Sequence, residues 1–261
     1  MSDLALLAAF ADELAEAARA TALRFSGSAA SAENKAKDGS FDPVTDADRE
    51  TERAIRTLIE ARFPGHGIDG EEFGHKPATD RYSWSLDPID GTRAFVCGLP
   101  SWTILIALLD QSRPVLGLID VPRLGERYVG HGEIAEWTSA SGRSALRTSD
   151  CRSLAEARFS TTDAHLFSGR EREGFERIRA EVRLTRYGLD AYAYARLAAG
   201  TLDLVVESGL APHDLNALVP VVTGAGGVVV NWEGGGDLSR GSLIAAATME
   251  LAEQAVARLA T

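Results

Sequence analysis

The stretch WSLDPIDGTRAF, Trp84–Phe95, joins the end of an expected strand to two aspartates and a Gly-Thr turn. Apolar and polar residues alternate up to Asp87, which predicts a half-buried strand that ends there. Pro88 interrupts the strand ladder, so we expect the backbone to turn and to direct the carboxylates of Asp87 and Asp90 and the Ile89 carbonyl to one place. This acidic pair indicates either a surface turn or a cation held beside a phosphate.

The segments around this stretch predict helices packed on an antiparallel sheet. Apolar residues recur at helical spacing over 4–25, and a second helix is expected from Thr45 to about 63. After the stretch, the segments 102–110, 114–122 and 125–130 are apolar and separated by short turns, which is typical of an antiparallel meander.

Beyond about residue 150 short apolar runs alternate with helical stretches, which predicts an α/β half with a mixed sheet. We therefore expect an N-terminal α+β half over 1–148 and a C-terminal α/β half over 149–261. No flexible linker separates them, so the two halves should pack closely.

Composition indicates an ordinary globular protein, with 261 residues, 45% hydrophobic and 25% charged. The net charge of −11 disfavours nucleic acid and anionic membranes as partners. No run approaches the roughly 18 apolar residues of a membrane span, and the N-terminus does not resemble a signal peptide, so a cytoplasmic protein is expected. Cys97 and Cys151 are not in a CxxC pattern and are expected to be small buried residues.

Several common catalytic patterns are absent from the sequence. There is no GxxxxGK[ST] and no GxSxG, which excludes a P-loop and the usual serine-hydrolase elbow. The histidines show no HxxxH or HExxH spacing, so zinc has little support. The remaining candidates for chemistry are acidic residues.

Acidic residues at the ends of expected strands and helices could form a metal site. Glu71 follows the apolar Ile68, and Asp214 opens a helix after an apolar strand. Each acid alone is most often a cap, a turn residue or a solvated charge. Together with Asp87 and Asp90 they would repel one another unless a cation neutralised them, and an all-oxygen set suits Mg²⁺.

Gly91-Thr92 can start a short helix whose free amides and positive dipole end favour a phosphate. Carboxylates for a metal beside amides for a phosphate predict a site for phosphate transfer or hydrolysis.

At these residues the sequence closely resembles the inositol monophosphatase superfamily of Mg²⁺-dependent, lithium-sensitive phosphatases. The resemblance rests on DPVTDADRETE (42–52), DGEEFG (69–74), the 84–95 stretch and ESGLAPHDLNALVPVVTGAGG (207–227), which occur in the family's order and spacing. It implies a layered αβαβα fold, commonly a homodimer, with the site between the α+β and α/β halves.

The resemblance also assigns roles to individual residues. The positions that match metal ligands are Glu71, Asp87, the Ile89 carbonyl, Asp90 and Asp214. Asp48 and Thr92 match the pair that orients the attacking water, and Gly91 and Thr92 match the phosphate-binding amides. Asp48 could also be a capping residue. The implied reaction is direct in-line hydrolysis with two or three Mg²⁺ ions, of which one makes hydroxide from a water also held by Glu71 and Thr92, and it needs no phosphoenzyme.

Three segments, 90–100, 190–200 and 209–220, look like the histidinol-phosphate phosphatase branch of the superfamily. Arg93 could touch phosphate or equally form a structural ion pair, and the positions that match the family's substrate pocket are Asp190, Glu207 and Asn216. Histidinol carries an ammonium and an imidazole, which need hydrogen-bond acceptors of this kind.

The alternatives are an inositol monophosphatase, a promiscuous phosphatase of sugar or nucleotide phosphates, and a non-catalytic protein that binds a phosphometabolite. Because the matched ligands, Asp48 and the Thr92 hydroxyl are all present, the sequence disfavours the non-catalytic alternative.

Overall fold

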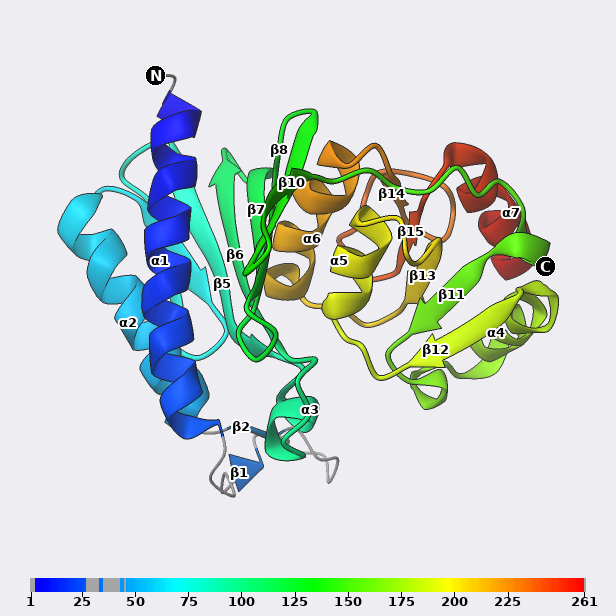
Figure 1. Cartoon of the computed structure of the whole chain (residues 1–261), viewed down its shortest axis with the longest axis horizontal. Helices are drawn as coiled ribbons and strands as arrows, with labels where there is room; N and C mark the ends of the chain where they lie inside the picture. Colours follow the sequence, from blue (N-terminus) through cyan, green and yellow to red (C-terminus); the bar gives the residue numbers. More distant parts are fainter. Residues whose placement is uncertain (1–2, 27–32, 35–42, 45, 261) are drawn as a thin grey trace.

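The computed structural model describes residues 3–26, 33–34, 43–44 and 46–260, and it has the predicted layered αβαβα architecture. Figure 1 shows helices α1 and α2, the larger sheet, helices α5 and α6, the smaller sheet, and the outer helices α4 and α7 as successive layers. The predicted cap Thr45 and the polar loop 27–41, apart from 33–34, lie outside the described residues.

The first sheet is almost entirely antiparallel, with strand order β10-β9-β8-β7-β6-β5-β3-β4. Its one parallel pair joins β3 to β5. The elements of this half are α1 (Asp3–Phe25), β1 (Glu33–Asn34), β2 (Pro43–Val44), α2 (Asp46–Arg62), β3 (Gly67–Gly70), β4 (Gly74–Lys76), β5 (Tyr82–Asp90), α3 (Thr92–Val96), β6 (Thr103–Asp110), β7 (Arg113–Val121), β8 (Glu126–His131), β9 (Ile134–Ser139) and β10 (Gly142–Ala145).

The second sheet is mixed, with strand order β12-β11-β13-β15-β14. Strand β11 is parallel to both of its neighbours, whereas β15 is antiparallel to both of its own. The elements of this half are η1 (Leu154–Glu156), β11 (Arg158–Thr161), η2 (Ala164–Leu166), α4 (Gly169–Glu181), β12 (Leu184–Tyr187), α5 (Tyr192–Ala198), β13 (Leu204–Glu207), α6 (Pro212–Gly224), β14 (Val228–Val230), β15 (Leu243–Ala246) and α7 (Met249–Leu259).

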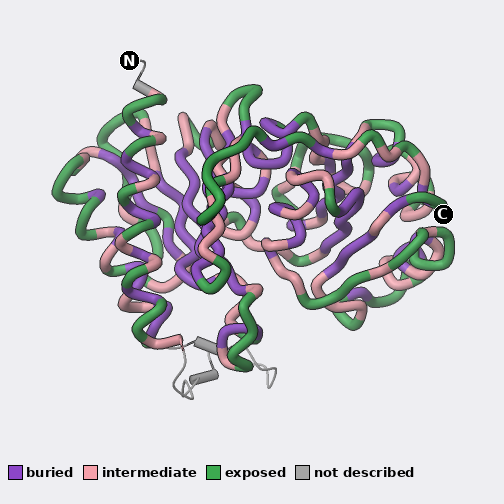
Figure 2. Tube along the Cα trace, viewed as in Figure 1, coloured by how far each residue is buried: buried purple, intermediate pink, exposed green. Residues whose placement is uncertain are grey.

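The prediction of a half-buried strand that ends at Asp87 is wrong in both respects. Strand β5 continues to Asp90, and Pro88 coincides with an irregularity in its pairing with β6 rather than with its end. In β5 the side chains from Trp84 to Ile89 are all buried. Helix α2 packs on one side of this strand and α6 on the other, so both faces are covered, as the burial along the chain shows in Figure 2. Trp84 meets the ring of Phe10 from α1 at 5.7 Å, while the Ser85 hydroxyl accepts a hydrogen bond from Asn216 of α6.

Helix α6 rests directly on the backbone of the first sheet, although it belongs to the second half of the sequence. A Cβ atom at Gly117 of β7 would lie 2.0 Å from the carbonyl oxygen of Ala217, and one at Gly130 of β8 would lie 2.2 Å from that of Pro220. Only glycine allows this approach. One hydrophobic cluster accordingly contains residues of both halves, and the position of α6 is fixed relative to β7 and β8.

A buried ion network joins α1 to the same sheet. The carboxylate of Asp120, on β7, accepts hydrogen bonds from the guanidinium groups of Arg19 at 2.9 Å and Arg127 at 2.8 Å. Arg127 also pairs with Asp12 and Glu16 of α1. Burial raises the pKa of Asp120, and the two arginines oppose that shift, so the charge at Asp120 depends on both partners.

The expectation that both cysteines are buried is wrong, because Cys97 is exposed and Cys151 is half-buried. Cys97 is the residue that ends the short helix α3, where the chain turns at the surface. Among the described helices, none has the length and apolar character needed to cross a lipid bilayer.

Candidate active site

Three carboxylates from two elements meet between the sheets. Asp87 and Asp90 lie on β5 and Asp214 lies in the first turn of α6, and each offers an oxygen within 4.8 Å of the others. Residues three apart in a regular strand point to opposite faces. Here the pairing of β5 with β6 shifts register between Asp87 and Asp90, and this irregularity brings both carboxylates to one place.

Hydrogen bonds from both halves fix two of these carboxylates. Asp90 accepts from the Thr103 hydroxyl at 3.1 Å and from the backbone N–H of Ala191 at 2.8 Å. Asp214 accepts from the backbone N–H of Ala211 at 2.7 Å, so it also caps the start of α6. The donors hold the carboxylate oxygens in place without neutralising their charge.

The buried carboxylates of the cluster repel one another, and a bound cation would relieve this repulsion. Burial raises the pKa of Asp87 well above its ordinary range, and the nearby carboxylates of Glu71, Asp90, Asp214 and Asp48 raise it further. Such a group of acids is stable in its ionised form only when positive charge is placed among them. An all-oxygen set of carboxylates fits Mg²⁺, so the residues present match the predicted metal.

Asp48 and Glu71 border the cluster from the α2 side and the β3 end. Asp48 is buried in the first turn of α2, with 1% of its surface exposed. Glu71 directly follows β3, and its backbone N–H donates to the carbonyl of Leu86 at 3.2 Å. Neither acid belongs to the group of three whose oxygens lie within 4.8 Å of one another, but the charges of both act on Asp87.

The Gly-Thr turn lies directly after Asp90 and begins α3, as predicted. Gly91 has a φ of 79°, in the left-handed region that favours glycine. The Thr92 hydroxyl donates to the Ile89 carbonyl at 3.1 Å. This bond keeps the threonine side chain beside the carbonyl that was predicted to bind the metal.

A cavity of about 320 Å³ extends from the cluster into the second half and is acidic along its length. Asp190 lines it and adopts a φ of 48°, a left-handed conformation that aspartate tolerates better than most residues. Its carboxylate lies against the Gly91 turn, since a Cβ atom at Gly91 would be 3.0 Å from Asp190 Oδ2. Burial raises the pKa of Asp190, and the nearby Arg93 opposes this shift.

Glu207, the last residue of β13, forms the far wall of this cavity. Its Oε1 accepts from the N–H of Thr162 at 2.7 Å and from the Thr162 hydroxyl at 2.9 Å, while its Oε2 accepts from the Thr161 hydroxyl at 3.3 Å. Burial is the main cause that raises the pKa of Glu207 to about 7. The carboxyl group can therefore change its protonation close to neutral pH.

This shift predicts a pH-dependent contribution of Glu207 to stability in the metal-free protein. Because the pKa is about 7 in the folded state and 4.5 ordinarily, the folded chain holds the proton more tightly between these values. Stability from this group should be fully present below pH 4.5 and be lost as pH rises through 7, by up to about 3 kcal/mol. Urea unfolding of wild type and Glu207→Gln at pH 5 and pH 8 measures it. The variant should lose less stability over that range than wild type, and equal losses would contradict the assignment.

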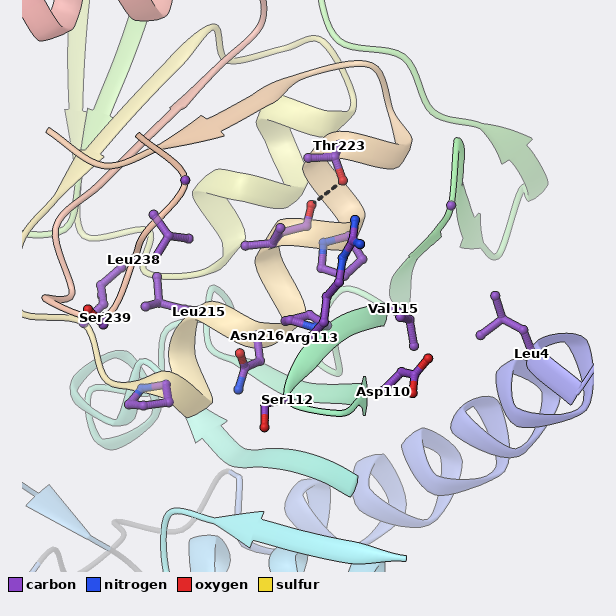
Figure 3. A pocket seen from close by; sticks show the side chains of 17 residues that line it. Leu4, Asp110, Ser112, Arg113, Val115, Leu215, Asn216, Thr223, Leu238 and Ser239 are labelled. Carbon is purple, nitrogen blue, oxygen red and sulfur yellow. Dashed lines mark hydrogen bonds between the residues drawn. The ribbon is translucent and has the colours of Figure 1, made fainter. Parts of the chain in front are cut away.

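Asn216 is not brought to this cavity, although it was predicted to contact substrate. Its amide donates to the Ser85 hydroxyl at 3.0 Å, and it lines a separate cavity of about 820 Å³. Figure 3 labels Asn216 together with Ser112 and Arg113 among the side chains that line this cavity. In α6, Asn216 and Asp214 point to different cavities because they lie about 200° apart around the helix.

Tyr194 of α5 lines the acidic cavity and was missed by the sequence analysis. It lies within AYAYARLAAG, an apolar helical segment in which a tyrosine is typical of a core residue. The sequence alone could not predict its position, because only the packing of α5 against β13 and α6 places this side chain between the carboxylates.

A model of the inositol monophosphatase family matches residues 3–261. The chain belongs to the inositol monophosphatase family. The solved structure of an inositol monophosphatase from Zymomonas mobilis superposes with a TM-score of 0.88 at 37% identity and covers 100% of both chains. For an IMPase from Thermotoga maritima the TM-score is 0.83 at 28% identity, over 96% of this chain and 95% of that one.

Relatives within the inositol monophosphatase family carry several substrate names. The chain is 45% identical to "Bifunctional phosphatase IMPL2, chloroplastic" of Arabidopsis thaliana over 79% of its length, and it spans 59% of that relative. It is 35% identical to a histidinol-phosphatase of Mycobacterium tuberculosis over 78% of this chain and 79% of the relative. With an inositol-1-monophosphatase of Mesorhizobium japonicum the identity is 32% over 79% of each.

Proposed function

We propose that the protein is a Mg²⁺-dependent phosphomonoester hydrolase that acts on L-histidinol phosphate and releases L-histidinol and phosphate, a step of histidine biosynthesis. One observation carries the proposal: the carboxylate cluster opens into a cavity whose walls present Asp190 and Glu207. The cluster suits a metal and a phosphate, and the acidic walls suit an alcohol with hydrogen-bond donors.

The metal would be held by the residues that surround the cluster: Glu71, Asp87, the Ile89 carbonyl, Asp90 and Asp214. Bound Mg²⁺ would neutralise the phosphate charge and make water a better nucleophile. Both are contributions that the acidic side chains do not provide.

The chain itself would position phosphate and water. We assign phosphate binding to the backbone amides of Gly91 and Thr92, where the start of α3 leaves N–H groups without partners inside the helix. The Thr92 hydroxyl donates to Ile89 and can still accept a hydrogen bond, so with Asp48 it would orient the attacking water in line with the ester bond.

The substrate assignment depends on charge. An ammonium group next to Asp190 would gain a charge-assisted hydrogen bond, whereas an uncharged polyol would gain little from an extra carboxylate. Glu207 is less selective, because a carboxylate also binds hydroxyl groups. Arg93 lies close enough to Asp190 to affect its pKa, and it could balance this charge or touch phosphate. Relatives of this chain from Chlorobaculum parvum, Mycobacterium tuberculosis and Streptomyces coelicolor are named histidinol-phosphatase, which supports the assignment.

Phosphate release tests the function directly. The purified protein is assayed with Mg²⁺ or with EDTA on histidinol phosphate, inositol 1-phosphate, fructose 1,6-bisphosphate and adenosine 3′,5′-bisphosphate, and kcat/KM is compared. We expect an EDTA-sensitive preference for histidinol phosphate. Preference for another ester would overturn the substrate but keep the metal site, and no release from any ester would favour a phosphometabolite-binding protein.

An inositol monophosphatase activity is the second candidate. It is favoured by the similarity to the Zymomonas mobilis inositol monophosphatase over the full length of both chains. A preference for inositol 1-phosphate in the same assay would establish it. The homodimer, the count of two or three ions and a cytoplasmic location stay predictions.

Asp190→Ala is predicted to raise KM for histidinol phosphate by roughly 10- to 100-fold, because a hydrogen bond to a charged group contributes about 1.5–3 kcal/mol. KM for a phosphate ester of an uncharged alcohol should change far less. Asp190→Asn keeps the size of the side chain and should show most of the same loss. Steady-state kinetics on both esters measures the effect, and equal changes in KM would mean that Asp190 does not bind the amine.

A further inference from the structure

Tyr194 presents a buried hydroxyl that finds no partner within the described part of the chain. The residue lies in α5 with 2% of its surface exposed, and its hydroxyl oxygen makes no hydrogen bond to any described residue. The side chain lines the cavity of about 320 Å³ next to the carboxylate cluster. The charges of Glu207, Asp90 and Asp214 all act on it.

Several other polar side chains along this cavity are half-buried and already have partners. Thr162 donates to Glu207, and Ser208 donates to Glu171. Asp90 and Asp214 accept the hydrogen bonds from Thr103, Ala191 and Ala211 that hold the cluster together.

Leaving a buried hydroxyl unpaired costs about 1–3 kcal/mol, and a phenylalanine would fill the same space without that cost. Packing alone therefore does not account for a tyrosine at position 194.

We propose that the Tyr194 hydroxyl donates a hydrogen bond to the alcohol half of the substrate, and this proposal rests on the phosphatase function proposed above. Ionised carboxylates only accept hydrogen bonds, whereas a phenol can donate one. The cavity thus offers Asp190 and Glu207 as acceptors and Tyr194 as a donor. The alcohol half must then carry an acceptor as well as donors.

A neutral imidazole meets both requirements within one ring, because one nitrogen donates and the other accepts. Among the described residues only Thr161 donates a hydrogen bond to Glu207 Oε2, which leaves a lone pair for the ring N–H. Tyr194 would then donate to the other ring nitrogen, and Asp190 would accept from the ammonium. A hydrogen bond from Tyr194 requires an acceptor on the substrate, such as the second ring nitrogen. Ionised carboxylates cannot recognise that nitrogen, because they only accept hydrogen bonds.

Tyr194→Phe tests the proposal with two esters that differ only in the ring. Histidinol phosphate carries the imidazole, and the phosphate ester of 2-amino-3-phenylpropanol replaces it with a phenyl ring. The variant should lose roughly three- to tenfold in kcat/KM on the imidazole ester, as expected for one hydrogen bond, and should be unchanged on the phenyl ester. The rise in melting temperature that histidinol with inorganic phosphate produces should shrink in parallel.

A structural role would give a different result. If Tyr194 only stabilised the fold, Tyr194→Phe would lower the melting temperature of the metal-free protein, whereas our proposal expects it to be equal or higher. Tyr192→Phe is the matched control, because this tyrosine also lies in α5 but its hydroxyl is bonded to Glu126. The control should keep the wild-type preference between the two esters. Equal loss on both esters, or none on either, would overturn the proposal.

The outcome for the proposed substrate is separate. If wild type hydrolyses neither ester, histidinol phosphate is wrong, and the same variant is then compared on the best ester of the panel and on methyl phosphate, whose alcohol half has no polar group. If Tyr194→Phe loses kcat/KM only on the larger ester, Tyr194 contacts the alcohol half of that ester. An equal change in kcat/KM on both esters would overturn this role.

Discussion

Asp87→Asn is expected to abolish phosphate release while raising the melting temperature of the metal-free protein. Burial holds the pKa of Asp87 well above the ordinary range, and the neighbouring carboxylates of Glu71, Asp90, Asp214 and Asp48 raise it further. Asparagine has nearly the same shape and no charge, so it relieves the repulsion. The same change removes a charged ligand from the proposed Mg²⁺ site.

The size of the two effects follows from the charges involved. Metal-assisted charge stabilisation contributes several kcal/mol to the transition state, so the loss of turnover should reach roughly a thousandfold or more. The rise in melting temperature on adding Mg²⁺ should also be smaller than in wild type. Phosphate release and thermal unfolding with and without Mg²⁺ measure both effects.

Asp150→Asn is the matched control for this variant, because the Asp150 side chain is 89% exposed. It removes the same charge and should leave activity and the Mg²⁺ response unchanged. Near-normal turnover in Asp87→Asn would refute the assignment of the metal site. A lower melting temperature for metal-free Asp87→Asn than for metal-free wild type would show that repulsion among the carboxylates does not destabilise the fold.

Asp120→Ala should cause the largest loss of stability, about 3–5 kcal/mol, because it leaves Arg19 and Arg127 without their buried partner. The effect should appear as a lower free energy of unfolding in urea. The carboxylate cluster lies on β5 and α6, whereas Asp120 lies on β7. At a low temperature, where the variant is still folded, each folded molecule should therefore bind Mg²⁺ as wild type does.

Two comparisons sharpen the Asp120 experiment. Asp120→Asn keeps a hydrogen-bond acceptor and should fall between wild type and the alanine variant. Asp110→Ala breaks the exposed pair with Arg81 on the same sheet and should have little effect. If the Asp110 and Asp120 variants were equally stable, the buried network would have no special role.

Local signals in the sequence were sufficient for the fold class, but not for the end of β5, which continues past Asp87 to Asp90. The Gly-Thr turn acts within a few residues, so the start of a short helix at Thr92 can be predicted without the tertiary fold. The layered fold is confirmed by the match of the family model and by the solved structures.

Features that depend on contacts distant in sequence were not predictable. The burial of β5 on both faces requires α6, which lies more than a hundred residues later. The register shift between Asp87 and Asp90 depends on how β5 pairs with β6. For the same reason Asn216 was assigned to a cavity that it does not line and Tyr194 was missed, because periodicity shows which face of a helix is apolar but not which cavity that face meets.

The glycine contacts beneath α6 hold the carboxylate cluster in place independently of the residues that form the cavity walls. Gly117 and Gly130 allow α6 to rest on the sheet backbone, and this contact fixes Asp214, in the first turn of α6, relative to Asp87 and Asp90. The cavity walls at Asp190 and Tyr194 belong to another segment, which meets Asp90 through the N–H of Ala191. On the proposed assignment, we expect substitutions in that segment to change which alcohol is accepted while the metal ligands keep their geometry, so that one hydrolytic centre could serve different phosphate esters.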